Sequence, residues 1–294
     1  MHIRIISPAG NIKGQLIDKG AATLKSWGHK VTIATHAKDK YGRFAATPEE
    51  RAADIIEALE DPSVDILWCS RGGYGVVQML DQIPLDLITK ANKPIIGFSD
   101  VTALHALWNK AGVKSLHAPM MKHLADDPTH RTTKVLRELL DYYATHNHTW
   151  PPKHNGLFLK AGARNIIAEI EPQAVEFSET DASTLSFVGG NLSVLSGLHG
   201  TPFDYDYEGK VLFIEDIAEH AYKVDRMLQH LRLMGVLSQI KGLVCGHFTE
   251  CDDDPTMPLR LWDNIRATVA PYGIPVLLGC PIGHELENYP VVIG

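Results

Sequence analysis

The chain has 294 residues, of which 45% are apolar and 21% are charged, and its formal net charge is -7. This composition is typical of a folded protein with a large core and excludes a largely disordered chain. The length predicts two domains or one large α/β domain. The acidic balance argues against a nucleic-acid partner, because nucleic-acid-binding proteins usually carry a basic face.

Cysteine usage and hydropathy favour a cytoplasmic protein. Cys69, Cys245 and Cys280 lie in or beside apolar runs, so we expect buried, unpaired thiols. No CxxC pair occurs, which excludes a zinc-ribbon or thioredoxin motif, and four cysteines in a chain of this length fit a reducing compartment. The N-terminus lacks the features of a signal peptide, and no apolar run is long enough to predict a membrane-spanning helix.

The first 145 residues alternate predicted strands and helices. We expect strands at 2–7, 29–35, 64–70 and 93–99, and helices at 13–28, 47–61, 76–83 and 100–112. The helix that follows Thr47 has a strong start signal, a capping threonine followed by proline and two acids. Such alternation predicts a parallel α/β domain over residues 1–145, with helices on both faces of the sheet and a site at the carboxyl ends of its strands.

The character of the chain changes after residue 145. Residues 146–163 are polar and contain two prolines, which is typical of a linker. Beyond them, short strands and glycine-rich turns are expected within 163–177 and 183–200, strands at 210–217 and 240–248, helices at 221–235 and 259–273, and a last strand with a turn at 274–284. This pattern predicts a second, smaller α+β domain over residues 164–294.

The sequence IIGFSD, which ends at Asp100, is the strongest local signal for catalysis. A serine at the tight turn between an apolar strand and a helix exposes its hydroxyl at the sheet edge, near the amides that begin the helix. Ser99 is therefore a candidate nucleophile, although Val101 departs from the usual GxSxG pattern. The structural alternative is that Ser99 or Asp100 caps the helix.

Residues 71–75, RGGYG, follow a predicted buried strand. Glycines in such a turn let the backbone approach a ligand closely and present amides to an anion. The turn matches neither a GK[ST] phosphate-binding loop nor GxGxxG. It is either a plain turn or, beside a nucleophilic serine, an oxyanion hole.

Two further segments carry groups that a serine nucleophile would need. Glu215 and Asp216 end a predicted strand, where acids are catalytic in some proteins and cap helices in many others. His284 follows a glycine after the last apolar strand. His247 also follows a glycine, and spacing alone does not choose between the two histidines.

No metal site is expected. His146, His148 and His154 lie close together but fall in the polar linker without carboxylate partners, so a solvated loop is the preferred interpretation. Trp68, Trp108 and Trp262 lie in apolar segments and are expected in the core.

Taken together and in order, these motifs resemble the LD-carboxypeptidase family, which includes murein tetrapeptide carboxypeptidases and microcin C immunity peptidases. The resemblance covers nearly the whole chain. The matching segments are SPAG, SRGGYG, KPIIGFSDVTALH, HAPM, GGNLSVLSGLHGTPF, the run from KVLFIEDI to GHFTEC, and PIGH.

The resemblance implies a serine peptidase without a cofactor or metal. Ser99 would be the nucleophile, Glu215 the acid that orients the base, and His284 the base. The backbone amides of Gly73 and Asp100 would form the oxyanion hole. A parallel α/β domain would carry the serine, a smaller α+β domain would carry the other two residues, and the protein would form a homodimer.

The implied activity is release of C-terminal D-alanine from murein tetrapeptides. Recognition of the terminal carboxylate is assigned to Arg71, Gly72 and Tyr74 as candidates. An alternative within the family is cleavage of an acyl-aminoacid–nucleotide linkage, which requires an aromatic side chain to stack on the base. An alternative of another class is a non-catalytic binding protein on an α/β scaffold, since a fold does not dictate a function.

Overall fold

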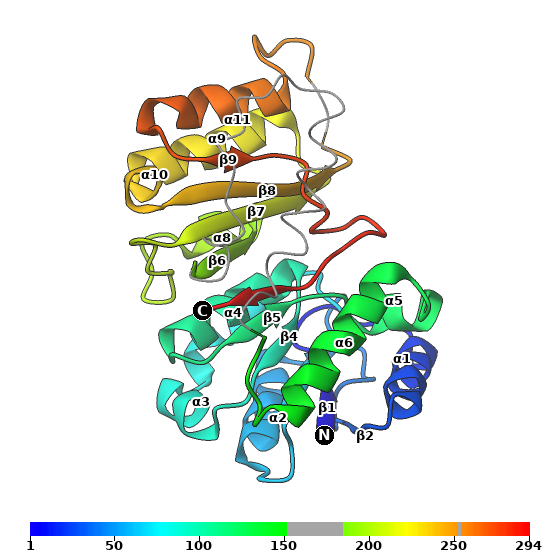
Figure 1. Cartoon of the computed structure of the whole chain (residues 1–294). Helices are drawn as coiled ribbons and strands as arrows, with labels where there is room; N and C mark the ends of the chain where they lie inside the picture. Colours follow the sequence, from blue (N-terminus) through cyan, green and yellow to red (C-terminus); the bar gives the residue numbers. More distant parts are fainter. Residues whose placement is uncertain (152–184, 252–253) are drawn as a thin grey trace. The chain divides into compact units, whose positions relative to one another are not determined.

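The computed structural model describes residues 1–151, 185–251 and 254–294 (Figure 1). The chain divides into two compact units. The first contains Met1–Pro151 together with Val292–Gly294, and the second spans Pro152–Val291.

The first unit is built on a six-stranded sheet with the order β10-β5-β4-β3-β1-β2. Its strands are β1 (His2–Ile6), β2 (Lys30–Ile33), β3 (Ile66–Cys69), β4 (Ile95–Gly97), β5 (Ser115–His117) and β10 (Val291–Ile293). The pairs from β2 through to β5 are parallel. The buried, β-branched character of these short runs is typical of a parallel sheet covered on both faces.

Helices cover both faces of this sheet (Figure 1). They are α1 (Gly14–Ser26), α2 (Pro48–Glu60), α3 (Leu85–Ala91), α4 (Thr102–Lys110), α5 (Met121–Asp126) and α6 (Arg131–Thr145). Ile3 and Ile5 of β1 join a core with residues of α1, α5 and α6. Arg4 points to the opposite face, as strand alternation requires, and forms ion pairs with Glu57 and Asp61 at α2.

The expected α/β fold class is confirmed, and so is the start signal at Thr47. The hydroxyl of Thr47 accepts the N–H of Glu50, and the carboxylate of Glu50 accepts the N–H of Thr47. The prediction of a helix at 76–83 is wrong. The chain instead forms two 3-10 turns, Val76–Gln78 and Leu80–Gln82. Ile83 precedes a proline, which disfavours helical backbone, and a helix begins only at α3.

The strand order places a topological switch between β1 and β3. From β1 the chain first builds β2 on one side and then returns to build β3 on the other. In such sheets ligands bind outside the carboxyl ends of the strands at this switch. The two loops that meet here are the one after β1, which contains Gly10, and the one after β3, which contains Gly72. The N–H of Gly10 donates to the carbonyl of Gly72 at 3.1 Å.

The second unit holds a separate parallel sheet with the order β6-β7-β8-β9. Its elements are β6 (Phe187–Asn191), α8 (Leu192–Leu198), β7 (Val211–Ile217), α9 (Ala221–Leu233), α10 (Val236–Gln239), β8 (Gly242–Thr249), α11 (Leu261–Val269), the 3-10 turn Ala270–Tyr272, and β9 (Val276–Leu277). Helix α9 packs against α8, α10 and α11. The strand expected from residue 274 ends early, because Gly279 and Gly283 adopt positive φ and Pro281 lies between them.

Some expectations lie outside the described residues. These are the short strands within 163–177, His154 and most of the linker at 146–163. Where the structure does describe the chain, Cys69, Cys245 and Cys280 are buried and unpaired, as expected. Trp68 and Trp108 are fully buried, whereas Trp262, which was also expected in the core, is only partly buried. Among the described residues no helix combines the length and hydropathy needed to cross a membrane.

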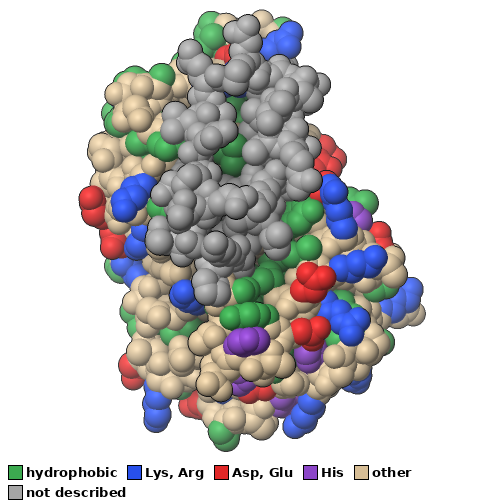
Figure 2. Space-filling model, in the orientation of Figure 1, with side chains coloured by type: hydrophobic (Ala, Val, Ile, Leu, Met, Phe, Trp, Pro, Cys, Tyr) green, Lys and Arg blue, Asp and Glu red, His purple; other side chains and the backbone are tan. Residues whose placement is uncertain are grey.

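Charged side chains are mixed on the surface. On the face shown in Figure 2, basic and acidic groups lie interspersed over the part that is coloured by type. The part of that face coloured by type therefore shows no extended basic surface, as the net charge of -7 predicts.

Candidate active site

Ser99 occupies a strained turn between β4 and the following helix. Its φ is 64°, in the left-handed region that non-glycine residues rarely adopt. Such a conformation costs on the order of 1–3 kcal/mol and persists where surrounding structure enforces it, often at functional sites. No side chain caps either the 3-10 turn Ser99–Val101 or α4. The alternative that Ser99 or Asp100 caps this helix is therefore wrong.

The glycine loop after β3 lies directly against the Ser99 hydroxyl. A methyl group at Gly72 would lie 2.7 Å from Cβ and 2.9 Å from Oγ of Ser99, and 3.2 Å from the amide nitrogen of Asp100. Only a residue without a side chain fits this approach. The loop after β3 and the turn after β4 therefore meet at the carboxyl edge of the sheet.

A buried arginine on α2 also anchors the glycine loop through hydrogen bonds. Arg51 of α2 is 1% exposed and donates to the carbonyls of Ala46, Pro8 and Gly75, and to the side-chain oxygen of Gln78. Burial lowers the pKa of Arg51, and the nearby charges of Asp100 and Glu49 oppose this. The guanidinium thus ties the loops that follow β1 and β3 to one another.

The side chain of Asp100 holds the loop from the other side. Its carboxylate accepts the N–H of Val76 at 3.0 Å. Burial raises the pKa of Asp100, while this hydrogen bond and the charge of Arg51 oppose the rise. The side chain of Asp100 therefore has a structural role, and its backbone amide stays at the Ser99 turn.

The other residues assigned to this loop lie in different surroundings. Gly73 has a φ of 118° and packs against Gly10, where a methyl group would lie 3.3 Å from the Cα atom. Arg71 is exposed and donates to the carbonyl of Asn11 at 3.0 Å. Tyr74 is 46% exposed and lies beside Phe44. Arg71 and Tyr74 are thus accessible to a ligand.

In the second unit, Glu215 and His284 form a hydrogen-bonded pair. The Nδ1 atom of His284 lies 2.7 Å from Oε2 of Glu215, which is fully buried at the end of β7. A carboxylate only accepts hydrogen bonds, so Nδ1 carries the proton and Nε2 keeps its lone pair. This is the tautomer required of a general base.

Two glycines and an asparagine shape the surroundings of this pair. A methyl group at Gly283 would lie 2.8 Å from Oε2 of Glu215, and one at Gly246 would lie 3.1 Å from its Cβ. The side-chain oxygen of Asn288, which is fully buried, accepts the N–H of Gly283 at 3.1 Å. The turn that presents His284 is therefore held tightly against the end of β7.

The electrostatics of His284 favour its protonated form more than those of an ordinary histidine do. Burial alone would lower its pKa, but the hydrogen bond to Glu215 and the charges of Glu215, Asp216 and Glu285 outweigh burial, so the pKa is raised above its ordinary value. The rival histidine differs. Burial lowers the pKa of His247, and its Nε2 atom has no hydrogen-bond partner in the described part of the chain.

Asp216 adopts the structural role that acids at strand ends often have. Its carboxylate accepts the side-chain N–H of Asn191 and the backbone N–H of Ser193, both at 2.9 Å. Ser193 lies in the first turn of α8, so Asp216 stabilises the start of that helix. Of the two neighbouring acids, one caps a helix and the other holds a histidine.

The described part of the chain places no metal centre beside these groups. Within residues 1–151, 185–251 and 254–294, no three histidine, cysteine or acidic side chains are arranged to hold an ion. His146 and His148 instead stack on Tyr142 and Tyr143 at the end of α6.

Sequence reasoning missed three residues of this region: Arg51, Asn191 and Asn288. Arg51 carried a weak signal, since it lies four residues before Ile55 on the apolar face of its helix. Asn288 carried none, because its role depends on a turn whose path the sequence does not specify.

Comparisons with known proteins identify related chains. Residues 3–118 match the LD-carboxypeptidase N-terminal domain, and residues 186–294 match the LD-carboxypeptidase C-terminal domain. A Bacillus subtilis protein named as a probable murein peptide carboxypeptidase is 30% identical, with 99% of this chain and 86% of the relative covered. The murein tetrapeptide carboxypeptidase of Pseudomonas aeruginosa is 26% identical, with 98% and 89% covered.

Solved structures also resemble this chain over its whole length. The muramoyltetrapeptide carboxypeptidase from Oxalobacter formigenes has a TM-score of 0.80 and 29% identity, covering 100% of this chain and 93% of that one. The microcin C7 self-immunity protein MccF, solved with aspartyl sulfamoyl adenosine, has a TM-score of 0.78 at 20% identity, covering 100% and 91%. The second match concerns the fold alone.

Proposed function

Because this chain belongs to the LD-carboxypeptidase family and is therefore a peptidase, we propose that it is a serine carboxypeptidase that releases C-terminal D-alanine from murein tetrapeptides. The observation that carries the proposal is the hydrogen bond between Glu215 and Nδ1 of His284, which holds the ring in the tautomer that a general base needs. The strained turn at Ser99 supplies the matching nucleophile.

In the proposed mechanism Ser99 attacks the carbonyl carbon of the bond before D-alanine. A serine hydroxyl is a weak nucleophile, so Nε2 of His284 accepts its proton as the new carbon–oxygen bond forms. Glu215 holds the ring in the correct tautomer and stabilises the imidazolium. The imidazolium then protonates the leaving amine, D-alanine departs, and a water molecule activated by the same histidine hydrolyses the acyl-enzyme.

The developing oxyanion is assigned to backbone amides of Gly73 and Asp100. The close approach of Gly72 to the Ser99 hydroxyl supports this, because it brings the loop after β3 to the reacting atom. A single donor of this kind contributes about 3 kcal/mol to transition-state stabilisation. Arg51 has no contact with substrate in this scheme and acts by positioning the loop.

Recognition of the terminal carboxylate is assigned to Arg71, Gly72 and Tyr74. The exposed guanidinium of Arg71 and the exposed ring of Tyr74 flank the glycine turn in sequence, which makes both available to a peptide terminus. A site built for a buried carboxylate discriminates strongly against a substrate that lacks the charge, because its donors are then left unpaired.

The family also suggests a microcin-immunity type of substrate, which needs an aromatic side chain to stack on a base. The sequence offers Phe203, Tyr205 and Tyr207 for this role, and two of the three are engaged elsewhere, whereas Phe203 is partly exposed. Tyr205 and Tyr207 are 6% and 3% exposed, and their hydroxyls donate to the carbonyl of Gly189 and the carboxylate of Asp204. The two buried tyrosines therefore give no support to a base-stacking site, and we retain the murein peptide as the proposed substrate. A non-catalytic binding protein would have no use for the Glu215–His284 pair.

The resemblance further implies a homodimer, and the composition of the chain favours a cytoplasmic protein with no nucleic-acid or membrane partner. We propose this assembly together with the activity. Light scattering coupled to size-exclusion chromatography measures it directly, and a mass of 32.4 kDa would indicate a monomer.

The test of the proposed function is incubation with an L,D-linked murein tetrapeptide. We expect release of free alanine by the natural chain and none above background by Ser99→Ala. An active Ser99→Ala variant, or an inactive natural chain, would contradict the proposal.

A further inference from the structure

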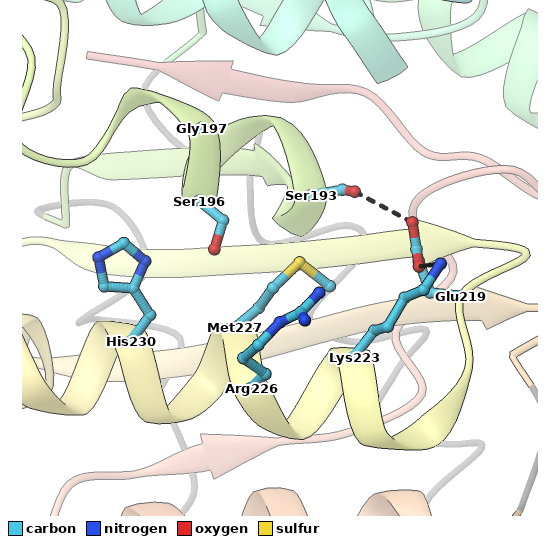
Figure 3. Close-up of a pocket in the computed structure, with 8 residues that line it drawn as sticks. All are labelled: Ser193, Ser196, Gly197, Glu219, Lys223, Arg226, Met227 and His230. Atoms are coloured by element: carbon cyan, nitrogen blue, oxygen red, sulfur yellow. Dashed lines mark hydrogen bonds and ion pairs between the residues drawn. The ribbon is translucent and has the colours of Figure 1, made fainter.

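A pocket lies in the second unit, between α8 and α9 (Figure 3). Its volume is about 460 Å³. It is lined by Ser193, Ser196 and Gly197 from α8, by Lys223, Arg226, Met227 and His230 from α9, and by Glu219 from the turn before α9. No step of the proposed mechanism uses this pocket.

The wall formed by α9 carries basic side chains on one face. Lys223, Arg226 and His230 follow one another at spacings of three and four residues, which places them on the same side of a helix. Figure 3 shows these side chains extending along the pocket below α8. The lining contains one lysine and one arginine but a single acidic residue. The pocket is therefore basic, although the net charge of the chain is -7.

Three of the lining side chains have no hydrogen-bond or ion-pair partner among the described residues. Lys223 is neutralised by Glu219 at 3.2 Å, and Glu219 also accepts the hydroxyl of Ser193 at 3.3 Å. In contrast, Arg226, Ser196 and His230 donate to no described side chain or carbonyl, and His230 only packs against the ring of His199. Their donors are therefore available to a ligand.

The chemistry of these three groups selects an anionic ligand. A guanidinium, a hydroxyl and an imidazole are all hydrogen-bond donors, and arginine presents its N–H groups in a fork that matches a carboxylate. Opposite Arg226, Gly197 adds no side chain, and a methyl group there would meet nothing within 4 Å, so the pocket has room for a substituent.

The pocket begins beside the carboxyl end of β7. Asp216, the neighbour of Glu215, accepts the backbone N–H of Ser193, and Glu219 follows the strand by two residues. One end of the pocket, at Ser193 and Glu219, therefore lies near the end of the strand that carries the proposed catalytic acid. A substrate that reaches Glu215 and His284 could extend an acidic substituent in this direction.

We propose that this pocket binds a carboxylate of the peptide substrate other than the terminal one, with Arg226 as its main ligand and Ser196 and His230 as supporting donors. The free α-carboxylate of a γ-linked D-glutamyl residue, as in a murein tetrapeptide, has the required chemistry. This inference rests on the proposed function, because it names a part of that substrate.

The test compares two tetrapeptides that differ only in this group, one with D-glutamate and one with D-isoglutamine, in which the carboxylate is an amide. We expect Arg226→Gln to raise KM for the acidic peptide by about tenfold or more, as for a lost hydrogen bond to a charged group, and to leave KM for the amide nearly unchanged. Arg226→Lys should recover part of the loss.

The matched control is Arg232→Gln. Arg232 lies on the same helix but is bonded to the side chain of Gln229, outside the pocket. This variant changes the net charge equally and should leave KM for both peptides unchanged. Equal effects of Arg226→Gln on the two peptides, or an effect of Arg232→Gln as large as that of Arg226→Gln, would overturn the proposal.

Calorimetric titration of the Ser99→Ala variant separates this inference from the proposed function, because binding is then measured without turnover. We expect the acidic peptide to bind more tightly than the amide, and the difference to vanish when Arg226→Gln is added. If both peptides bind equally and inorganic phosphate alone competes for Arg226, the pocket serves another anion and the proposal is wrong. A natural chain that binds both peptides selectively but releases no alanine would instead contradict the proposed function.

Discussion

Substitution of Gly72 by alanine should inactivate the protein without unfolding it. The new methyl group would lie 2.7 Å from Cβ and 2.9 Å from Oγ of Ser99. Carbon atoms that are not bonded prefer about 3.5–4.0 Å, so the Ser99 side chain or the glycine loop must move by roughly 1 Å. Gly72 is not among the residues with positive φ, and its own backbone therefore accepts alanine without strain.

The magnitude follows from the geometry required for nucleophilic attack. A displacement of about 1 Å of a reacting group can reduce the rate about 100-fold. If the loop rather than the serine moves, the amide of Gly73 leaves the oxyanion, and loss of one such donor also costs about 100- to 1,000-fold in kcat. Overpacking of this kind destabilises a folded protein by about 1–3 kcal/mol, so the variant should still fold.

The assay is the rate of alanine release at saturating tetrapeptide, together with thermal unfolding followed by circular dichroism. The matched control is Gly14→Ala, at the start of α1 in the same unit. A methyl group there would meet only the flexible side chain of Lys38, at 3.5 Å. The control should keep its activity and change the free energy of unfolding by less than about 1 kcal/mol. A folded Gly72→Ala variant with an unchanged kcat would refute the assignment of this loop to the site.

Other predictions concern the base, the loop and metals. The pKa of His284 is raised above its ordinary value, and the base must be neutral to accept a proton. We therefore expect kcat/KM to fall as the pH drops, with a midpoint above about 6.5. A flat profile from pH 5 to 8 would contradict this. Glu215→Gln should lower kcat by about 10⁴-fold, by analogy with the same change in a serine-protease triad, and near-natural turnover would exclude the orienting role. Arg51→Met should lower the melting temperature, and it should lower kcat by about tenfold or more, because the glycine loop loses its anchor. A change in melting temperature alone would show that Arg51 has a purely structural role. Activity should persist in EDTA, and a loss that zinc restores would exclude the serine mechanism.

Strands β1 to β4 and helices α1, α2 and α4 of the first unit could be predicted from its sequence, whereas β5, β10, α3, α5 and α6 were not assigned. Its strands are short, apolar and separated by well-signalled helices, and Thr47 begins its helix with the predicted capping box. Residues 76–83 could not be assigned correctly, because their apolar content resembles a helix while Pro84 prevents one. Local pattern therefore specifies elements well where competing signals are absent.

The geometry of the site depends on contacts between distant segments, which local pattern does not contain. Glu215 and His284 were each identifiable at strand ends, but their pairing spans 69 residues. The preference for His284 over His247 arises from the turn that Gly283 and Asn288 form against Glu215. The buried position of Arg51 likewise follows from three carbonyls that converge only in the folded chain.

The most direct test of the central claim measures free alanine released from three peptides by the natural chain and by Ser99→Ala. The peptides are a murein tetrapeptide ending in D-alanine, the same peptide amidated at its C-terminus, and a version ending in L-alanine. We predict rapid release from the first peptide only, and none with Ser99→Ala, because the site needs both the serine hydroxyl and a correctly placed terminal carboxylate. Equal turnover of all three peptides, or turnover without Ser99, would contradict a serine LD-carboxypeptidase.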